Sequence, residues 1–263
     1  MRITSLQNPR IKNVVKLHQH RQRRRQGRFL IEGYRALWYA AEQGYPIEEV
    51  YRCPPLYFGK NEDALLDRLA AGGAQIMEVT EEVFLKMAVR GRPEGLLAVA
   101  PQCHRTLLEH QPPPHAFYLI AEAVEKPGNL GTLLRSADGA GASGVIVCDP
   151  CTDIWHPDVV RGSVGAFFTM PLFECKSQTV LSWCRAHGIQ MLAATPQAET
   201  LYTAVDMTGP VAIAVGTEQY GLSETWLTAA DCQIKLPMLG TANSLNVAVA
   251  ATLLLYEVVR QRP

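Results

Sequence analysis

The chain has 263 residues, of which 48% are hydrophobic, and its 25 Lys and Arg residues balance 25 Asp and Glu residues. This apolar content excludes a disordered tail. No apolar run approaches the ~18 residues of a membrane span, and no apolar stretch follows Met1-Arg2-Ile3-Thr4, so we expect neither a spanning helix nor a signal peptide. Seven scattered cysteines, an odd number, do not fit a secreted disulfide framework, so we expect a soluble protein of the reducing cytoplasm.

The N-terminal segment is strongly basic although the whole chain is neutral. Its first 35 residues hold ten basic side chains and one acid, Glu32, a net charge of +9. Such a segment is typical of a surface that neutralises nucleic-acid phosphates; the alternative is a solvated helix face or an import-like run. Apolar residues at helical spacing, such as Ile11 and Val14, predict a helix that turns its charges outward. The candidate RNA contacts are Arg10, Lys12, Arg21, Arg23, Arg24, Arg25 and Arg28.

A small α/β domain is predicted from the alternation of strand-like and helical runs before residue 103. The expected strands span residues 29–31, 47–51, 76–79 and 95–100, and the expected helices span 34–43, 61–71 and 81–86. Three consecutive prolines at 112–114 cannot continue a helix or a central strand, so they indicate a linker. We therefore place the first domain at residues 1–105, the linker at 106–116 and the second domain at 117–263.

The second domain shows a longer alternation, which predicts a parallel, doubly wound sheet. Its expected strands span residues 117–124, 144–148, 190–194, 211–216 and 233–237. Its expected helices lie near residues 130–140, 157–166, 178–187, 223–230 and 244–261. Ligands of such sheets bind in the loops beyond the carboxyl ends of the strands, so the motifs in these loops are the candidate sites.

The first motif follows the strand that begins at residue 117 and contains the run Pro127-Gly128-Asn129. Pro and Gly form the turn, Asn129 can cap the helix, and a leucine stripe predicts its buried face. Arg135 falls off that stripe toward the ligand side of the sheet, where its guanidinium suits a phosphate. The alternative is a surface arginine paired with Asp138 one turn later.

Two further motifs follow strands in the same way. The first runs from Gly216-Thr217-Glu218 through Gly221 to Ser223, which is a good N-cap. Its two glycines would let a ligand approach the backbone. The alternative is an ordinary turn between a strand and a helix. This motif matches neither the phosphate-binding P-loop nor the dinucleotide-binding glycine pattern. Before the last helix, a polar cluster exceeds the hydrogen-bonding needs of one cap and indicates a polar ligand. This cluster consists of Asn243, Ser244 and Asn246.

A metal site is not expected. Cys148 and Cys151 form a lone CxxC pair without a second pair or a suitably spaced histidine. No nucleophile elbow is present. Arg161 could face a ligand, but a helix-face arginine is the favoured interpretation.

Together and in this order, the three motifs resemble the SpoU (TrmH-type) family of RNA ribose 2′-O-methyltransferases in the SPOUT superfamily. The resemblance covers residues 117–260 through PGNLGTLLRSAD, VGTEQYGLS and LPMLGTANSLNVAVAATLLLYE. It implies an α/β fold whose C-terminal parallel-sheet domain contains a deep trefoil knot. The N-terminal region resembles the smaller L30e-like α/β domain that binds RNA substrates in many members.

The resemblance also implies a cofactor, S-adenosylmethionine, and a homodimer with the active site near its interface. The implied cofactor-binding residues are Thr195, in the loop after Ala194, and Gly216, Leu236 and Leu245. The implied polar active-site residues are Asn129, Arg135, Glu218, Ser244 and Asn246. This sequence departs from the family at Lys126, where Asp is common, and at Thr217, where Asn is common, which leaves the details of the loops and the substrate open.

The resemblance implies methyl transfer to a ribose 2′-hydroxyl, with 23S-type ribosomal RNA as the favoured substrate. The alternatives are a transfer-RNA ribose methyltransferase and a non-catalytic RNA-binding protein. In the family proposal Arg135, polarised by an RNA phosphate, accepts the hydroxyl proton. Because a guanidinium is a poor base, the alternative has Arg135 hold that phosphate while phosphate or water accepts the proton.

Overall fold

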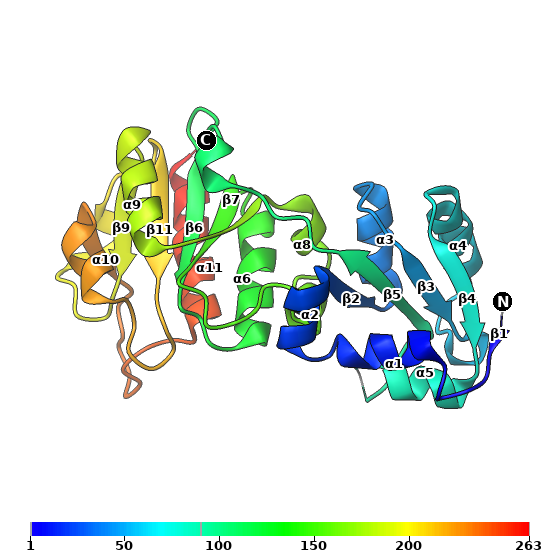
Figure 1. The fold of residues 1–263 in the computed structure, drawn as a ribbon. Helices are drawn as coiled ribbons and strands as arrows, with labels where there is room; N and C mark the ends of the chain where they lie inside the picture. Colours follow the sequence, from blue (N-terminus) through cyan, green and yellow to red (C-terminus); the bar gives the residue numbers. More distant parts are fainter. Residues whose placement is uncertain (1, 90, 263) are drawn as a thin grey trace. The chain divides into compact units, whose positions relative to one another are not determined.

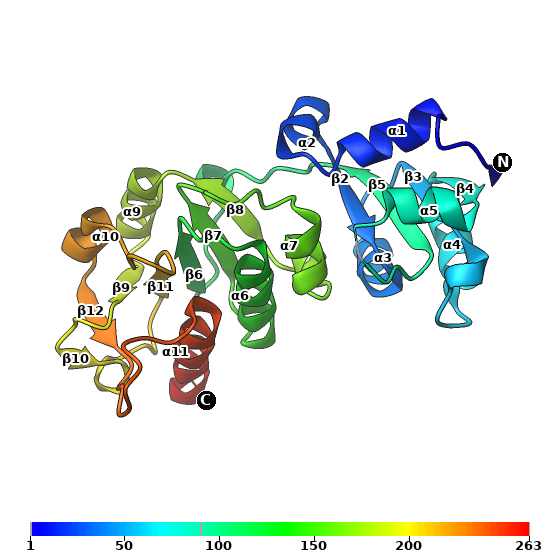
Figure 2. The ribbon, with the colours of Figure 1, turned by 90° about the horizontal axis from the view of Figure 1, so that it is seen from below.

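A computed structural model describes residues 2–89 and 91–262 as two compact units (Figures 1 and 2). Unit 1 comprises Met1–Cys103 together with Asp153–Thr169, and unit 2 comprises His104–Thr152 together with Met170–Pro263. Each unit contains its own sheet and its own hydrophobic core. The second stretch of unit 1 is an excursion from the chain of unit 2, which nothing in the sequence indicated.

Unit 1 is built on a mixed sheet of five strands in the order β1-β4-β3-β5-β2. The strands are β1 (Arg2–Ile3), β2 (Arg28–Glu32), β3 (Glu49–Arg52), β4 (Gln75–Val79) and β5 (Leu96–Pro101). β4 pairs in parallel with β1 and β3, whereas β5 pairs antiparallel with β3 and β2. The four predicted strands are confirmed, and the two-residue β1 is an addition.

Helices cover both faces of this sheet. They are α1 (Pro9–Lys16), α2 (His20–Gln26), α3 (Tyr34–Glu42), α4 (Glu62–Ala71) and α5 (Glu81–Met87). α1 and α5 pack together on one face, and α3 and α4 lie side by side on the other (Figure 1). Ile11, Val14 and Leu17 are fully buried in the core beneath α1, as their helical spacing predicts.

The excursion packs on β2 and completes the core of unit 1. It holds two short helices, α7 (Pro157–Gly162) and α8 (Ala166–Thr169), in place of the single helix predicted at 157–166. The Phe29 ring of β2 lies 5.0 Å from Trp155 and 5.7 Å from Phe167, centroid to centroid. These aromatic contacts hold the excursion against β2 in unit 1.

A buried ion pair joins the excursion to α2. Arg23 is 1% exposed, and its guanidinium lies 2.6 Å from the Asp153 carboxylate and donates to the carbonyls of Leu17 and His18. An arginine enclosed in this way is not accessible to a phosphate. The assignment of Arg23 to the RNA-contact set is therefore wrong, whereas its neighbours Arg24 and Arg25 are exposed.

Unit 2 contains a sheet of seven strands, all parallel, in the order β10-β12-β9-β11-β6-β7-β8. The strands are β6 (Phe117–Glu122), β7 (Gly144–Cys148), β8 (Leu172–Cys175), β9 (Gln190–Ala194), β10 (Thr200–Leu201), β11 (Val211–Val215) and β12 (Cys232–Lys235). β6, β7 and β11 are buried along their whole length, as expected for strands covered on both faces. The predicted parallel α/β architecture is confirmed, with β8 and β10 as additions.

Four helices cover the two faces of this sheet. α6 (Pro127–Gly139) and α11 (Val247–Gln261) pack together on one face, and α9 (Ser177–Ala186) and α10 (Glu224–Ala229) lie on the other (Figure 2). Part of the predicted linker packs on unit 2, because Leu107 is buried in its core. In the part of the chain that the structure describes, no helix is long and apolar enough to cross a bilayer.

Arg23→Ala tests the buried ion pair against a neighbour on the same helix. It leaves the Asp153 carboxylate buried without its counterion, so we expect the free energy of unfolding to fall by about 3–5 kcal/mol. Arg24→Ala, on the exposed side of α2, should change it by less than about 0.5 kcal/mol. Urea unfolding followed by fluorescence measures both, and equal effects would contradict the buried pair.

Candidate functional site

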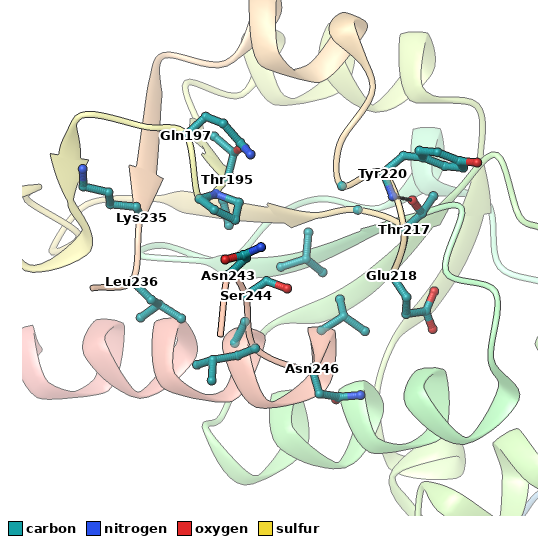
Figure 3. Close-up of a pocket in the computed structure, with 18 of the residues that line it drawn as sticks. Thr195, Gln197, Thr217, Glu218, Tyr220, Lys235, Leu236, Asn243, Ser244 and Asn246 are labelled. Carbon is teal, nitrogen blue, oxygen red and sulfur yellow. Dashed lines mark hydrogen bonds between the residues drawn. The ribbon is translucent and has the colours of Figure 1, made fainter. Parts of the chain in front are cut away.

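Four loops meet at the carboxyl ends of β6, β9, β11 and β12 and enclose a cavity of about 510 Å³ (Figure 3). Parallel pairing places these strand ends at one edge of the sheet, which is where such sheets bind ligands. The volume lies within the range of small-molecule sites, about 300–1,000 Å³. Apolar side chains of Val215, Ile234 and Leu254 line the cavity together with polar groups from the loops.

The loop after β11 is closed by its own backbone. The N–H groups of Thr217 and Gly221 donate to each other's carbonyl oxygens at 2.9 and 3.1 Å. Gly216 packs so closely on Gly221 that a Cβ there would lie 2.1 Å from its carbonyl carbon. Beyond the loop, the N–H and hydroxyl of Ser223 donate to the buried carboxylate of Glu122 at 2.7 and 2.5 Å. The loop is thus fixed at both ends.

Glu218 connects this loop to the first and third motifs. Its Oε1 accepts from Asn129 Nδ2 at 2.6 Å and from the Lys126 N–H at 3.3 Å. Its Oε2 accepts from the Glu125 N–H at 3.1 Å. The side-chain Oδ1 of Asn129 in turn accepts from Asn246 Nδ2 at 3.2 Å. A continuous hydrogen-bonded chain therefore joins three of the five predicted active-site residues.

This network keeps Glu218 ionised. Burial disfavours the charged form, but the hydrogen bond from Asn129 and those from backbone N–H groups, including Glu125 and Lys126, outweigh it. The pKa of Glu218 is therefore lowered from its ordinary value of 4.5. At neutral pH the site therefore holds a carboxylate that accepts from the loop after β6 and from Asn129 on α6.

The last helix begins later than predicted, at Val247 rather than at residue 244. Asn246 is its N-cap, with Oδ1 accepting from the Ala248 N–H at 3.0 Å while Nδ2 donates to Asn129. Asn243 and Ser244 precede the cap outside any helix or strand and line the cavity. Asn246 alone caps the helix, so Asn243 and Ser244 are polar groups beyond those that the cap requires.

The predicted cofactor residues all line the same cavity: Thr195, Gly216, Leu236 and Leu245. Thr195 and Leu236 are labelled in Figure 3. Thr195 is 9% exposed, and its hydroxyl donates to Gln197 Oε1 at 2.5 Å. Gln197, Lys235 and Tyr220 also line the cavity but were not singled out from the sequence. Only their position after strand ends could have suggested them, which is a weak signal.

Arg135 is exposed on α6 and is not among the residues that line the cavity. It lies one and a half turns beyond Asn129 on the same helix. The favoured structural interpretation of Arg161 is confirmed, because it pairs with Asp158 on α7 at 2.7 Å. Within residues 2–89 and 91–262 no cluster of three or more His, Cys, Asp or Glu side chains could hold a metal ion.

The predicted RNA contacts other than the buried Arg23 fall into two groups. Arg10 and Arg28 form ion pairs within unit 1, with Glu49 at 3.0 Å and Glu48 at 2.7 Å. The other four are exposed: Lys12, Arg21, Arg24 and Arg25. The exposed group on α1 and α2 is the more accessible to a phosphate.

Two family models match this chain. Residues 116–256 match the SpoU rRNA Methylase family, and residues 8–98 match an MRM3-like substrate binding domain. The first match spans all four loops of the cavity. The second lies within the first stretch of unit 1.

Similar proteins extend over the whole chain. A 23S rRNA (uridine(2479)-2′-O)-methyltransferase of Streptomyces viridochromogenes is 31% identical over 99% of this chain and 92% of its own. A crystal structure of an RNA 2′-O ribose methyltransferase is 43% identical, covers 99% of both chains and superposes with a TM-score of 0.87. A crystal structure of an AdoMet-bound rRNA methyltransferase from Sinorhizobium meliloti is 30% identical, with a TM-score of 0.90. The match covers 99% of this chain and 97% of that one.

Glu218→Gln tests the carboxylate at the centre of the network. Because the side chain is partly exposed, we expect a loss of about 1 kcal/mol in the free energy of unfolding at neutral pH. The pKa of Glu218 is lower in the folded protein than in the unfolded chain. The ionised carboxylate therefore stabilises the fold fully at a pH above its pKa in the unfolded chain, and this stabilisation is lost as the pH falls through its pKa in the folded protein.

Urea unfolding of the wild type and of Glu218→Gln, from about pH 7 to about pH 3, measures how the stability of each depends on pH. The difference between them should be complete at neutral pH and shrink once the pH falls below about 4. A difference that is the same at every pH would contradict a stabilising charge on Glu218.

Proposed function

Because the chain belongs to the SpoU rRNA methylase family, we propose that it transfers a methyl group from S-adenosylmethionine to a ribose 2′-hydroxyl of 23S-type ribosomal RNA. The observation that carries this proposal is the chain Glu218–Asn129–Asn246, which joins the three motifs beside the cavity. The relatives named above act on ribosomal RNA or on an RNA ribose. A ribosomal substrate also supports a cytoplasmic location.

The cavity fits S-adenosylmethionine in size and chemistry. Its apolar walls suit an adenine ring, and Thr195, Asn243 and Ser244 provide side-chain hydrogen-bonding groups. The backbone around Gly216, Leu236 and Leu245 would hold the rest of the cofactor. The Glu218 carboxylate at the rim favours a cationic group in the cavity. When bound, S-adenosylmethionine supplies an electrophilic methyl group.

Positioning of the ribose is the main task of the protein groups in this mechanism. Asn246 and Ser244 lie at the cavity beside the start of α11 and orient the 2′-hydroxyl. Asn129 and Glu218 fix Asn246 and the loop through their hydrogen bonds. The hydroxyl oxygen forms its bond to the methyl carbon as the carbon–sulfur bond breaks, and the hydroxyl proton must leave.

Arg135 is the residue that we assign to the RNA phosphate. Its exposed guanidinium on α6 is free to form a bidentate contact with a phosphate next to the target ribose. A guanidinium stays protonated at neutral pH, so in our proposal the phosphate or water accepts the proton and Arg135 acts by position and charge. Its place outside the cavity lining is consistent with a partner other than the cofactor.

Unit 1 binds the RNA substrate in this proposal. The match of residues 8–98 to a substrate binding domain supports this role. Four exposed basic residues of α1 and α2 supply the sequence-independent phosphate contacts: Lys12, Arg21, Arg24 and Arg25. Arg10 and Arg28 join them only where their ion pairs with Glu49 and Glu48 leave donors free.

Family membership also leads us to propose a trefoil knot formed by the C-terminal helix. α11 follows β12, next to the sheet edge, yet packs against α6 and the central strand β11. Its end lies along the loop after β10, where Gln261 Nε2 donates to the Val205 carbonyl at 3.0 Å and Arg262 Nε donates to that of Met207 at 3.1 Å. A knot requires the chain to pass through an earlier loop, and these contacts place the end of α11 against such a loop.

We further propose a homodimer that uses the exposed face of α11. Val249, Leu253 and Tyr256 follow one another at helical spacing and are 44–49% exposed. A contiguous apolar stripe of this kind is typical of an interaction surface. α6, which carries Asn129 and Arg135, packs beside α11, so a partner on this face would lie near the proposed active site.

Arg135→Ala tests the assignment of the active site. Purified protein is incubated with labelled S-adenosylmethionine and with ribosomal or transfer RNA, and the product is mapped by resistance to alkaline cleavage. We expect ribosomal RNA labelling to fall by a factor of about 100 or more, since Arg135 contacts the reacting RNA. Cofactor affinity should change by less than about twofold, because Arg135 does not line the cavity.

Arg185→Ala, an exposed arginine of α9, is the matched control and should label RNA like the wild type. Label in transfer RNA alone would favour the other substrate class. A wild-type protein that labels neither RNA would contradict the proposed reaction.

Leu253→Glu tests the homodimer. A charge in the middle of the apolar stripe should convert the wild-type dimer to a monomer, because its burial in an interface without a partner costs several kcal/mol. Leu85→Glu, at a leucine of α5 that is 50% exposed, should remain dimeric. Sedimentation equilibrium gives both masses, and a monomeric wild type would contradict the proposal.

A further inference from the structure

The loop after β11 displays an aromatic side chain that the proposed chemistry does not use. Tyr220 is 79% exposed, so its ring packs little against the protein itself. It lines the cavity from the same loop as Glu218 and lies only two residues beyond it. In Figure 3 both side chains project at the end of the cavity away from Leu236 and Lys235.

The backbone that carries Tyr220 is held in place. Its N–H donates to Thr217 Oγ1 at 2.9 Å, inside the turn closed by the hydrogen bonds between Thr217 and Gly221. Gly221 takes the left-handed conformation, with a φ of 72°, that returns the chain to the buried Leu222. Because the backbone is ordered beforehand, only the two side-chain torsions of the tyrosine remain to be fixed on binding.

An exposed aromatic ring on a fixed backbone is suited to stacking on a nucleobase. RNA is read at unpaired nucleotides, whose bases stack on Tyr, Phe, Trp or His side chains. The adenine of the cofactor is the other aromatic ring near this site. However, Thr195, Leu236 and Leu245 bind the cofactor in our proposal, and Tyr220 projects away from Leu236 (Figure 3).

We infer that Tyr220 stacks on the base of the nucleotide whose ribose is methylated and so positions that ribose beside Asn246 and Glu218. This proposal rests on the proposed methyl transfer to RNA. Stacking recognises any base through its π-face, so Tyr220 selects an unpaired nucleotide rather than a sequence. Identification of a particular base would need other groups.

The test is a double-mutant cycle between Tyr220→Ala and an RNA that is abasic at the methylated position mapped in the assay above. On the intact RNA we expect kcat/KM to fall by about 5-fold to 150-fold in Tyr220→Ala, the range for loss of one stacked base. On the abasic RNA the wild type and the variant should react equally. Tyr220→Phe keeps the ring and should retain most of the wild-type activity.

Other outcomes would overturn the proposal in distinguishable ways. An equal loss on intact and abasic RNA would place the ring elsewhere, and a raised Kd for S-adenosylmethionine in Tyr220→Ala would assign it to the cofactor. Wild-type activity in Tyr220→Ala would exclude a stacking role while leaving the proposed methyl transfer intact. A wild-type protein that transfers no methyl group would contradict both the proposed reaction and the stacking role. Urea unfolding that matches the wild type is the control that Tyr220→Ala is folded.

Discussion

Parallel pairing in the larger sheet is the constraint on which the site depends. Because β6, β9, β11 and β12 run in the same direction, their carboxyl ends lie at one edge, and loops more than 100 residues apart in sequence come together there. A shared sheet edge brings the polar groups of these loops close together but does not fix their positions. Glu218 fixes two of the loops by accepting hydrogen bonds from Asn129 and from two backbone N–H groups of the loop after β6. One ionised side chain thereby sets the relative position of two motifs.

The same logic separates structural from accessible arginines in unit 1. Charge counting treats the arginines of α2 as equivalent, but a helix has one inward face, and Arg23 lies on it. Its charge is compensated by Asp153, which belongs to a stretch more than 100 residues later in the chain. Of the seven predicted RNA contacts, the exposed ones are therefore Lys12, Arg21, Arg24 and Arg25.

Much of the fold could be predicted from the sequence because its strands are continuous apolar runs separated by glycine and proline turns. The strands at 144–148 and 190–194 were predicted to the residue. β8 was not predicted, because only one of its four residues, Phe173, is fully buried and its pattern is weak. The excursion could not be predicted, since its partner Phe29 is distant in sequence. Motifs indicated which polar residues gather at the site, whereas Tyr220 became notable only once its exposure was known.

The excursion has a consequence for the order in which the protein folds during its synthesis. The sheet of unit 1 is complete once residue 101 has been made, yet the face of β2 that carries Phe29 waits for Trp155 and Phe167. Until then Arg23 also lacks its carboxylate. The ribosome must therefore translate well into unit 2 before unit 1 reaches its native core. A cut at the proline-rich segment would leave the first stretch of unit 1 without Trp155, Phe167 and Asp153, so that Phe29 and Arg23 would lose these partners.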